Sequence, residues 1–172
     1  MGRKRKMPSC RSIADANKDL TDSLGISPLE AEKTCWRCRY LFSTGNPMRA
    51  HVQAASQAGS DHPTNFYCLC NRCHSEQPDN APREYQDKWL RIKPGNNWDE
   101  MTATGIVSEE FFNMTQRPIS SLFDVMMDEY GTRGMSLRIG SAMKNANQDK
   151  AGSGNGIANA IYKLTEIWEQ LT

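Results

Sequence analysis

The chain of 172 residues contains no run of about 18 apolar residues, the length that a helix needs to span a bilayer. Residues 1–8 carry four basic side chains, but no apolar stretch follows them, so we expect no secretory signal peptide. Internal repeats, a glycine-rich phosphate loop, a dinucleotide-binding fingerprint and a serine-nucleophile elbow are also missing. These absences disfavour membrane, exported, solenoid, nucleotide-binding and serine-hydrolase classes. They favour a cytoplasmic protein.

Charge is spread unevenly along the chain. The composition, with 38% hydrophobic and 24% charged residues and a mean hydropathy of −0.69, fits one domain of ordinary size or a compact module with helical additions. Residues 1–30 carry six Lys/Arg against four Asp/Glu, and residues 31–93 carry nine against six. Residues 94–172 reverse the balance, with six against ten. A polyanionic partner is therefore expected to meet the front of the chain, although two differently solvated surfaces would give the same pattern.

Four of the six cysteines form two pairs, Cys35-x-x-Cys38 and Cys70-x-x-Cys73. Each pair has the two-residue gap of a zinc knuckle, in which a tight turn presents two thiolates to one metal ion. With no export signal expected, a reducing environment disfavours disulfides, and no βαβ pattern of a redox protein accompanies either pair. The spacing predicts one structural Zn²⁺ held by four cysteines, with a redox C-x-x-C pair as the alternative.

The other two cysteines have different expectations. Cys10 stands in a polar N-terminal stretch and is expected to be a bystander. Cys68 stands two residues before Cys70, so it offers an alternative ligand to the second pair. Cys70 and Cys73 fit the knuckle turn better, which makes Cys68 a small buried hydrophobic residue.

The local patterns predict a chain that is helical at both ends. Ser12 is expected to cap a first helix that Gly25 closes, and Ser27-Pro28-Leu29-Glu30 has the form of a capping box that begins a second. Residues 49–52 and 65–69 are predicted strands, followed by a short helix beginning near His74. Residues 83–92 and 121–130 show helical spacing, and residues 151–156 are expected to form a break. A last helix carries a stripe, more typical of a core than of a partner surface, formed by Ile157, Ile161, Leu164, Trp168 and Leu171.

A longer pattern surrounds the second cysteine pair. Residues 65–74 have the form N-x-x-x-L-C-x-x-C-H, and His51 lies fourteen residues before Asn65. This pattern resembles the HNH endonucleases, whose module is the ββα-metal finger, in the subgroup braced by a four-cysteine zinc. The resemblance covers about residues 35–79, and its positions, in order, are Cys35, Cys38, His51, Asn65, Cys70, Cys73 and His74.

The resemblance implies an α+β fold with a zinc-braced ββα-metal finger core. The organisation would be a basic tail and helical lead in residues 1–30, the nuclease module in residues 31–95 and a helical C-terminal region in residues 96–172. Hydrolysis of a phosphodiester needs a base near neutral pKa, and the resemblance assigns that role to His51. It assigns Asn65 to orienting the base and His74 to binding a catalytic Mg²⁺ or Mn²⁺. The implied partner is DNA, more readily double-stranded, in a bacterial or phage-infected cell.

Two departures from the family pattern concern the catalytic metal and the loop. The acidic residue that commonly precedes the catalytic histidine is Ala50 here, and the proline that often stands three residues after it is Ala54. Asp79 and Asp61 are alternative carboxylate ligands, and water or substrate phosphates can complete the shell of a magnesium ion. His74 has a second interpretation as a zinc ligand, Asn65 has one as a turn residue, and His62 is expected to be a surface residue.

Four arginines near the knuckles are candidates for contacts with phosphates: Arg37, Arg39, Arg49 and Arg72. Ordinary surface arginines are the alternative. The competing functions are a zinc-knuckle protein that binds nucleic acid or assembles without catalysis, and an adaptor that binds a partner or a second copy through its acidic C-terminal helices.

Overall fold

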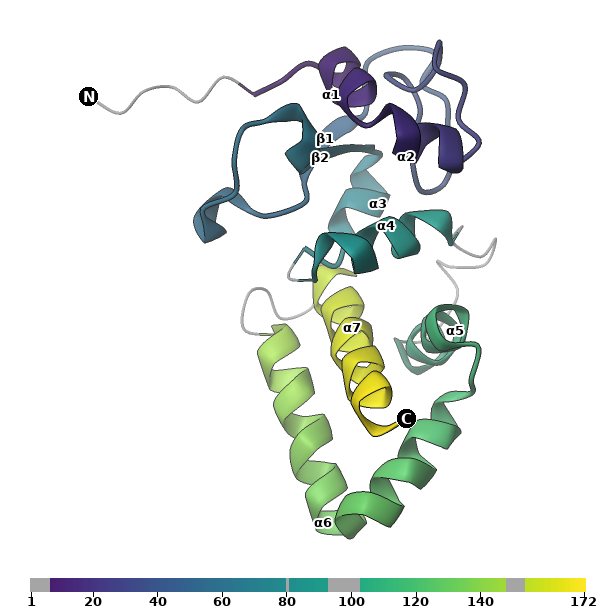
Figure 1. Ribbon diagram of the computed structural model, residues 1–172, viewed down its shortest axis with the longest axis vertical. Helices are drawn as coiled ribbons and strands as arrows, with labels where there is room; N and C mark the ends of the chain where they lie inside the picture. The colour runs from purple at the N-terminus through teal and green to yellow at the C-terminus, as the bar shows by residue number, and fades with distance from the viewer. Residues whose placement is uncertain (1–6, 80, 93–102, 148–153) are drawn as a thin grey trace, which may run out of the picture. The chain divides into compact units, whose positions relative to one another are not determined.

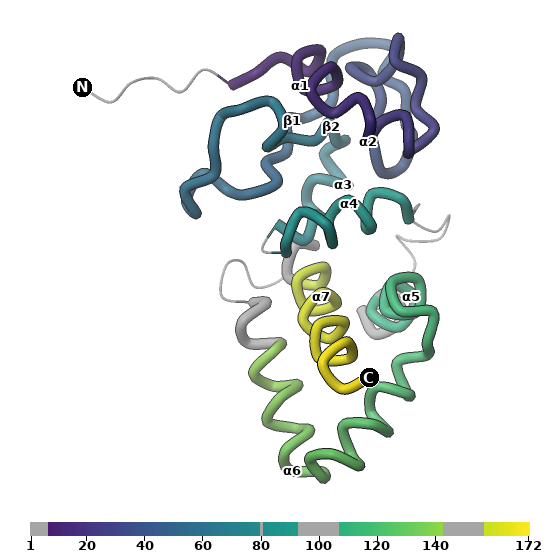
Figure 2. Tube along the Cα trace, viewed as in Figure 1, coloured from purple at the N-terminus to yellow at the C-terminus, as the bar shows by residue number. Residues whose placement is uncertain are grey.

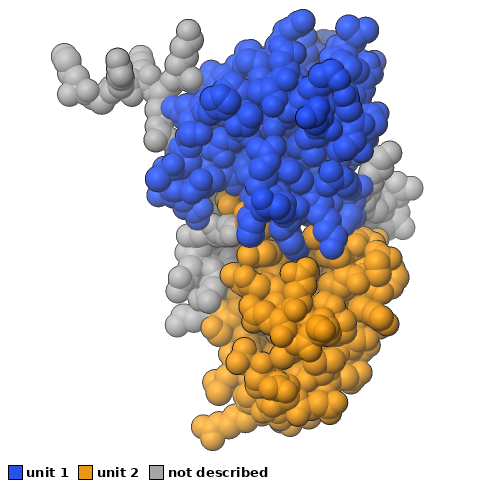
Figure 3. All heavy atoms as spheres, in the orientation of Figure 1, with its two compact units in different colours: residues 1–75, 82–94 blue, residues 76–81, 95–172 orange. Residues whose placement is uncertain are grey.

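A small antiparallel sheet of two four-residue strands lies in an otherwise mostly helical chain (Figure 1). The computed structural model describes residues 7–79, 81–92, 103–147 and 154–172. It divides into two compact units (Figure 3), one formed by residues 1–75 and 82–94 and the other by residues 76–81 and 95–172. The mixed fold has helix, a small sheet and a cluster of four cysteines.

The first unit follows the order helix, helix, strand, strand, helix, helix. Helices α1 (Cys10–Ala16) and α2 (Lys18–Ser23) precede strand β1 (Met48–His51). The loop after β1 contains the single 3-10 turns η1 (Ala55–Gln57) and η2 (Pro63–Asn65) and leads into strand β2 (Phe66–Leu69). Helices α3 (Asn71–Ser75) and α4 (Arg83–Arg91) follow. The register of β1 and β2 pairs Met48 with Leu69 and His51 with Phe66.

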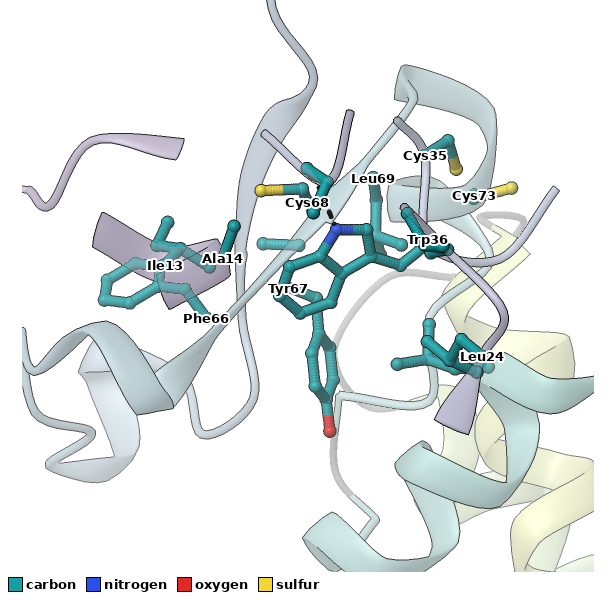
Figure 4. Close-up of a cluster of buried hydrophobic side chains, with 14 of the residues drawn as sticks. Ile13, Ala14, Leu24, Cys35, Trp36, Phe66, Tyr67, Cys68, Leu69 and Cys73 are labelled. Carbon is teal, nitrogen blue, oxygen red and sulfur yellow. Dashed lines mark hydrogen bonds between the residues drawn. The ribbon is translucent and has the colours of Figure 1, made fainter. Parts of the chain in front are cut away.

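The core of the first unit collects residues from all of its segments. Strand β2 is buried along its whole length, and α1, the first knuckle and α4 cover it with Ile13, Trp36 and Trp89. Trp36 is fully buried, its indole Nε1 donates to the Ala31 carbonyl at 2.9 Å, and its ring lies 6.0 Å from that of Tyr67. Figure 4 shows Trp36 among the side chains of β2, with the sulfurs of Cys35 and Cys73 at one edge. A two-stranded sheet is marginal by itself, so this packing is needed for its stability.

The expected helix boundaries near the N-terminus need correction. The cap of α1 is Ser9, because its side chain accepts the amide hydrogen of Ser12, one turn before the predicted position. Gly25 ends the second helix with a positive φ of 68°, as expected of a helix-closing glycine. Residues 27–33 form turns rather than the helix that the capping box predicts. The reason is that Thr34 already pairs with Leu41, so the backbone must be extended within a few residues.

The described residues of the second unit form three helices. They are α5 (Ala103–Thr115), α6 (Ile119–Asn147) and α7 (Gly154–Leu171), with a core of Phe111, Leu122, Met126 and Leu164. The predicted apolar stripe of α7 packs inward: Ile161 and Leu164 are buried, and the half-buried Trp168 meets the Phe111 ring edge-on at 6.3 Å. The region expected to break the chain, residues 151–156, lies outside the described residues up to 153, and α7 begins at residue 154.

Element α6 consists of two helical segments joined by a kink at Gly131, the residue expected to follow a helix ending at Tyr130 (Figure 2). Gly131 has φ 62° and ψ 176°, a combination that essentially only glycine adopts. Within the described helices, none is long and apolar enough to cross a membrane.

We predict that Gly131→Ala lowers the free energy of unfolding by about 1–3 kcal/mol, because an added Cβ strains the backbone at this bend. The Cβ itself would meet no atom within 4 Å, so the cost comes from the backbone alone. The matched control is Gly140→Ala in the same helix, where the Cβ also meets nothing. That change should stabilise the protein by about 0.5–1 kcal/mol, because alanine favours helical backbone. Denaturant titration followed by circular dichroism measures both, and equal effects of the two changes would show that the bend is not strained by a side chain.

Candidate metal centre and histidine site

The four predicted ligands Cys35, Cys38, Cys70 and Cys73 come together, with their sulfurs all within 4.8 Å of one another. A tetrahedral zinc with Zn–S bonds of about 2.3 Å places its sulfurs about 3.8 Å apart. The sulfurs of Cys38 and Cys70 are 3.9 Å apart, which matches that edge. Four clustered thiols could therefore hold a structural metal such as zinc. Since four sulfurs complete the tetrahedron, His74 is not needed as a fourth ligand.

Backbone hydrogen bonds shape the two knuckle turns. In the first, the amide of Arg39 donates to the Cys35 carbonyl at 2.9 Å, and Arg39 takes a positive φ of 67° to make the turn. In the second, the amide of Cys73 donates to the Cys70 sulfur at 3.4 Å. The amide of Trp36 donates to the Cys68 carbonyl at 2.8 Å and joins the first knuckle to β2. The first turn is therefore tied to the strand that leads into the second.

The thiols of the cluster cannot all ionise without a cation. Hydrogen bonding with Cys35 and Cys38 and, to a lesser extent, burial raise the pKa of Cys73. Hydrogen bonds from Cys35 and Cys73 have the opposite effect on Cys38 and lower its pKa to about 2. One thiolate is thus stabilised at the expense of its neighbours. A bound divalent cation removes this competition, because it offsets the charge of several thiolates at once. The electrostatics of the cluster therefore fit a metal site.

Cys10 and Cys68 lie outside the four-sulfur cluster. Cys68 is completely buried in β2, as expected for a small hydrophobic residue, and in Figure 4 its sulfur points away from those of Cys35 and Cys73. Cys10 is half-buried at the start of α1 and its thiol donates to the Pro47 carbonyl at 3.6 Å. A hydrogen bond from Cys68 lowers the pKa of Cys10 to about 7. Cys10 and Cys68 are free thiols that contact each other, and neither belongs to the four-sulfur cluster.

His51 is the last residue of β1 and is half-buried against Phe66, its partner in the sheet. The two ring centroids are 4.2 Å apart, and the Nε2 atom of the imidazole is shielded from solvent. Successive strand residues point to opposite faces, so His51 shares a face with Arg49, while Ala50 faces the core and is completely buried. The strand therefore fixes both the position of the imidazole and the side from which it is reached.

Asn65 fastens the two ends of the loop between β1 and β2. Its Nδ2 donates to the carbonyls of Gln53 at 3.0 Å and Ser60 at 2.8 Å, and its Oδ1 accepts the amide of Gln53 at 3.0 Å. Its backbone carbonyl accepts the amide of Val52 at 2.9 Å. These bonds hold residues 52 and 53, directly after His51, against the start of β2. Asn65 thus links distant backbone and is more than a local turn residue.

His74 lies in the last turn of α3, which begins at Asn71, earlier than the start near His74 that the sequence predicts. Helix α3 packs against both strands, so His74 belongs to the strand-strand-helix segment that also carries His51 and Asn65.

Asp61 is half-buried in the loop between the strands, next to the Ser60 carbonyl that Asn65 binds. Asp79 belongs to the second unit, where Asn159 donates to it at 3.2 Å. Among the described residues, the four cysteines form the one group of three or more ligating side chains close enough for a metal ion.

The four arginines predicted to contact phosphates differ in how accessible they are. Arg37 is completely buried, its guanidinium stacks 4.2 Å from the Trp89 ring and its Nε donates to the Ile92 carbonyl at 3.3 Å. A phosphate cannot reach it there, so the expected contact is wrong. Arg39 is half-buried and donates to the carbonyls of Arg37 and Leu90. Arg49 is exposed on β1, and Arg72 is half-buried on α3. Nearby, His62 is exposed, as predicted, and caps η2 by accepting the amide of Thr64.

Three further side chains reach the backbone around His51 and Asn65, and the sequence pattern does not single them out. They are Asn17 after α1, and Arg83 and Gln86 on α4. All three stand outside the segment that the cysteines and histidines delimit, and Asn17 is separated from Arg83 by 66 positions. The available signal for Gln86 was a polar residue at helical spacing from the apolar Trp89 and Leu90, and the structure buries it completely. No protein-family model, curated protein or solved structure matches this chain.

We predict that the purified protein holds one zinc ion and that Cys38→Ser or Cys73→Ser releases it, because three thiolates bind zinc much more weakly than four. Loss of the ion should lower the free energy of unfolding by more than about 4 kcal/mol, since metal binding contributes directly to folding. Elemental analysis and denaturant titration measure the two effects. Cys10→Ser is the matched control and should keep the zinc. A folded, untagged protein without bound metal would contradict the prediction.

Proposed function

We propose that this protein is a metal-dependent endonuclease of the HNH type that hydrolyses phosphodiester bonds in DNA. The observation that carries the proposal is that His51 ends β1 and the side chain of Asn65 is hydrogen-bonded to the backbone of Gln53, two residues after His51. The strand order, the helix α3 behind it and the four-sulfur cluster agree with a ββα-metal finger, the finer fold that we propose for residues 48–75.

In this proposal His51 is the general base. An imidazole titrates near neutral pH, so it can accept a proton from water while the water attacks phosphorus. The ring of His51 is held by Phe66 on one side, and the loop after it is held by Asn65. Both contacts restrict where the imidazole can go. A base that is held in place needs less reorganisation when the substrate arrives.

His74 is the proposed ligand of a catalytic Mg²⁺ or Mn²⁺, which would stabilise the negative charge that develops on the pentacoordinate phosphorus centre and on the leaving 3′ oxygen. His74 is positioned by the second knuckle, since its amide donates to the Cys70 carbonyl at 2.9 Å. Asp61 is the carboxylate of the first unit that we include as a candidate second ligand. We leave Asp79 out because it is hydrogen-bonded to Asn159 within the second unit.

The proposed substrate is double-stranded DNA. Arg49 is exposed and shares a face of β1 with His51, so a phosphate at the imidazole would lie within reach of its guanidinium. Arg72 on α3 is the second candidate contact, and residues 1–93 carry the positive excess of the chain. Contacts of this kind hold a backbone in place without reading its sequence.

The residue at position 50 supports a second candidate function, that of a zinc-knuckle protein that binds nucleic acid without cutting it. The position that carries an acidic metal ligand in the family pattern is Ala50, and it is completely buried opposite Tyr67. The four-sulfur cluster and the exposed arginine would serve a binding protein equally well. A catalytic assay on histidine variants separates the two functions.

We predict that His51→Ala reduces DNA cleavage by about two to four orders of magnitude, because the attacking water loses its base. Relaxation and linearisation of supercoiled plasmid in magnesium buffer measures the rate. His62→Asn is the matched control, since His62 is an exposed histidine of the adjoining loop and asparagine keeps a side-chain acceptor at the cap of η2, so this variant should cut at the wild-type rate. A His51→Ala protein that cuts as fast as wild type would remove His51 from the mechanism. A wild-type protein that binds plasmid and leaves it intact would favour the binding function.

We also predict that brief EDTA treatment abolishes cleavage while zinc and secondary structure persist, because a closed four-thiolate site exchanges slowly and an open site does not. Added Mg²⁺ or Mn²⁺ should restore activity, and excess Zn²⁺ should restore it poorly. His74→Ala should lose this rescue and keep its zinc. If His74→Ala instead released the zinc and unfolded the first unit, His74 would be a structural residue and the binding function would be preferred.

A further inference from the structure

Side chains from outside the strand-strand-helix segment hold the backbone on which His51 and Asn65 stand. We propose that Asn17 and Arg83, assisted by Gln86, act as a clamp of positioning residues for the base and its organising asparagine. The effect of these residues on catalysis rests on the proposed function. The hydrogen bonds by which they hold the backbone do not depend on it.

Four consecutive carbonyls, those of residues 63–66, are engaged, three of them by the side chains of Asn17 and Arg83. Asn17 Nδ2 donates to the carbonyl of Pro63 at 3.2 Å and is within 3.5 Å of that of Phe66. The guanidinium of Arg83 donates to the carbonyl of Thr64, and the carbonyl of Asn65 accepts the amide of Val52. The turn that presents the Asn65 side chain is therefore fixed at each of its peptide groups.

The two halves of the clamp also bind each other. Arg83 Nη2 donates to Asn17 Oδ1 at 2.8 Å. Asn17 Nδ2 in turn donates to the Ile13 carbonyl of α1 at 2.8 Å. Asn17 is only 5% exposed, so its amide has no competing water and the loss of a partner would be costly. The Asp87 carboxylate lies 3.4 Å from Arg83 Nε and accepts the Tyr67 hydroxyl at 2.5 Å, which orients the guanidinium.

Gln86 binds the backbone on the β1 side of the loop, directly after His51. It is completely buried on α4, and its Nε2 donates to the carbonyl of Val52 at 2.8 Å. Val52 directly follows His51 and its amide is bound by Asn65, so both peptide groups of this residue are engaged. Helix α4 thus contacts the backbone after the base through Gln86 and the backbone before β2 through Arg83.

The consequence is that a shift of α1 or α4 would move the imidazole relative to Asn65. A displacement of about 1 Å at a reacting group can cost about a hundredfold in rate while substrate binding is unaffected. Positioning residues should therefore lower kcat and leave KM and the overall fold nearly unchanged. A residue that only contributes stability would not produce that split.

The test compares Arg83→Met and Asn17→Asp, which keep the size of each side chain and remove its donors to residues 63–66. The matched control is Arg91→Met, because Arg91 is an arginine of the same helix whose partners are Ser23 and the Asp87 carbonyl. Arg83→Lys keeps one cationic donor and should recover part of the effect. Zinc content and circular dichroism establish that each variant is folded.

Amide hydrogen exchange reads the clamp without any assay of activity. The amides of Val52 and Gln53 both donate to Asn65, so they should exchange about tenfold faster in Arg83→Met and Asn17→Asp. The amide of His74, which donates to Cys70, should exchange as in wild type. In plasmid cleavage, kcat should fall about ten- to a hundredfold with KM within about threefold.

The outcomes separate the clamp from the nuclease. Unchanged exchange of Val52 and Gln53 in both variants would overturn the clamp even if the wild-type protein cuts DNA. Faster exchange with an unchanged kcat would overturn its positioning role. If the wild-type protein cuts no DNA, the proposed function fails, and the exchange of these two amides alone decides whether Asn17 and Arg83 hold the turn.

Discussion

The meeting of four cysteine sulfurs within 4.8 Å is the constraint on which the first unit depends. Two strands of four residues cannot form a stable sheet by themselves, and β2, which pairs with β1, leads directly into the second knuckle. The second strand ends one residue before Cys70, and Trp36 of the first knuckle donates its amide to Cys68 within that strand. A cation that fixes the sulfurs also fixes where β2 ends and where α3 begins. Everything that the candidate site contains is attached to these elements.

Packing from both ends of the unit then completes what the sulfurs begin. Helix α1 covers β2 with Ile13, and α4 brings Trp89 and Leu90 against the same core. Arg37 shows how strongly this packing dominates, because a charged group is fully buried to stack on Trp89 and bind the Ile92 carbonyl. Its delocalised guanidinium is more weakly hydrated than an ammonium, so burial is tolerable when such partners are present. The knuckle residue that a sequence would place at the surface thereby joins α4 to the metal centre.

Sequence reasoning reached the features that have local or spaced signatures. The cysteine pairs, both strands, helix α4 and the inward stripe of α7 follow from spacing and periodicity, which are visible within short windows. It missed features decided by distant contacts. Thr34 pairs with Leu41 and prevents the helix that residues 27–30 predict, and Arg37 is buried by a tryptophan 52 positions away. Asn17 and Arg83 have no motif of their own, because their role exists only once α1 and α4 meet the turn at residues 63–66.

The alanine at position 50 illustrates how the core and the candidate chemistry limit each other. In an antiparallel pair, Ala50 stands opposite Tyr67 and points away from the face of His51 and Arg49. It is completely buried, so a carboxylate at this place would have to give up its hydration inside a core of aromatic and aliphatic side chains. The small side chain of Ala50 fits this buried face opposite Tyr67. Under the proposed function, the ligands of the catalytic cation other than His74 must then come from outside β1, and the loop carboxylate Asp61, water and the substrate phosphate are the groups proposed to supply oxygen. Under the same proposal, such a site would bind its cation weakly until substrate arrives, and the loop held by Asn65, Asn17 and Arg83 would contribute more to positioning than the metal does.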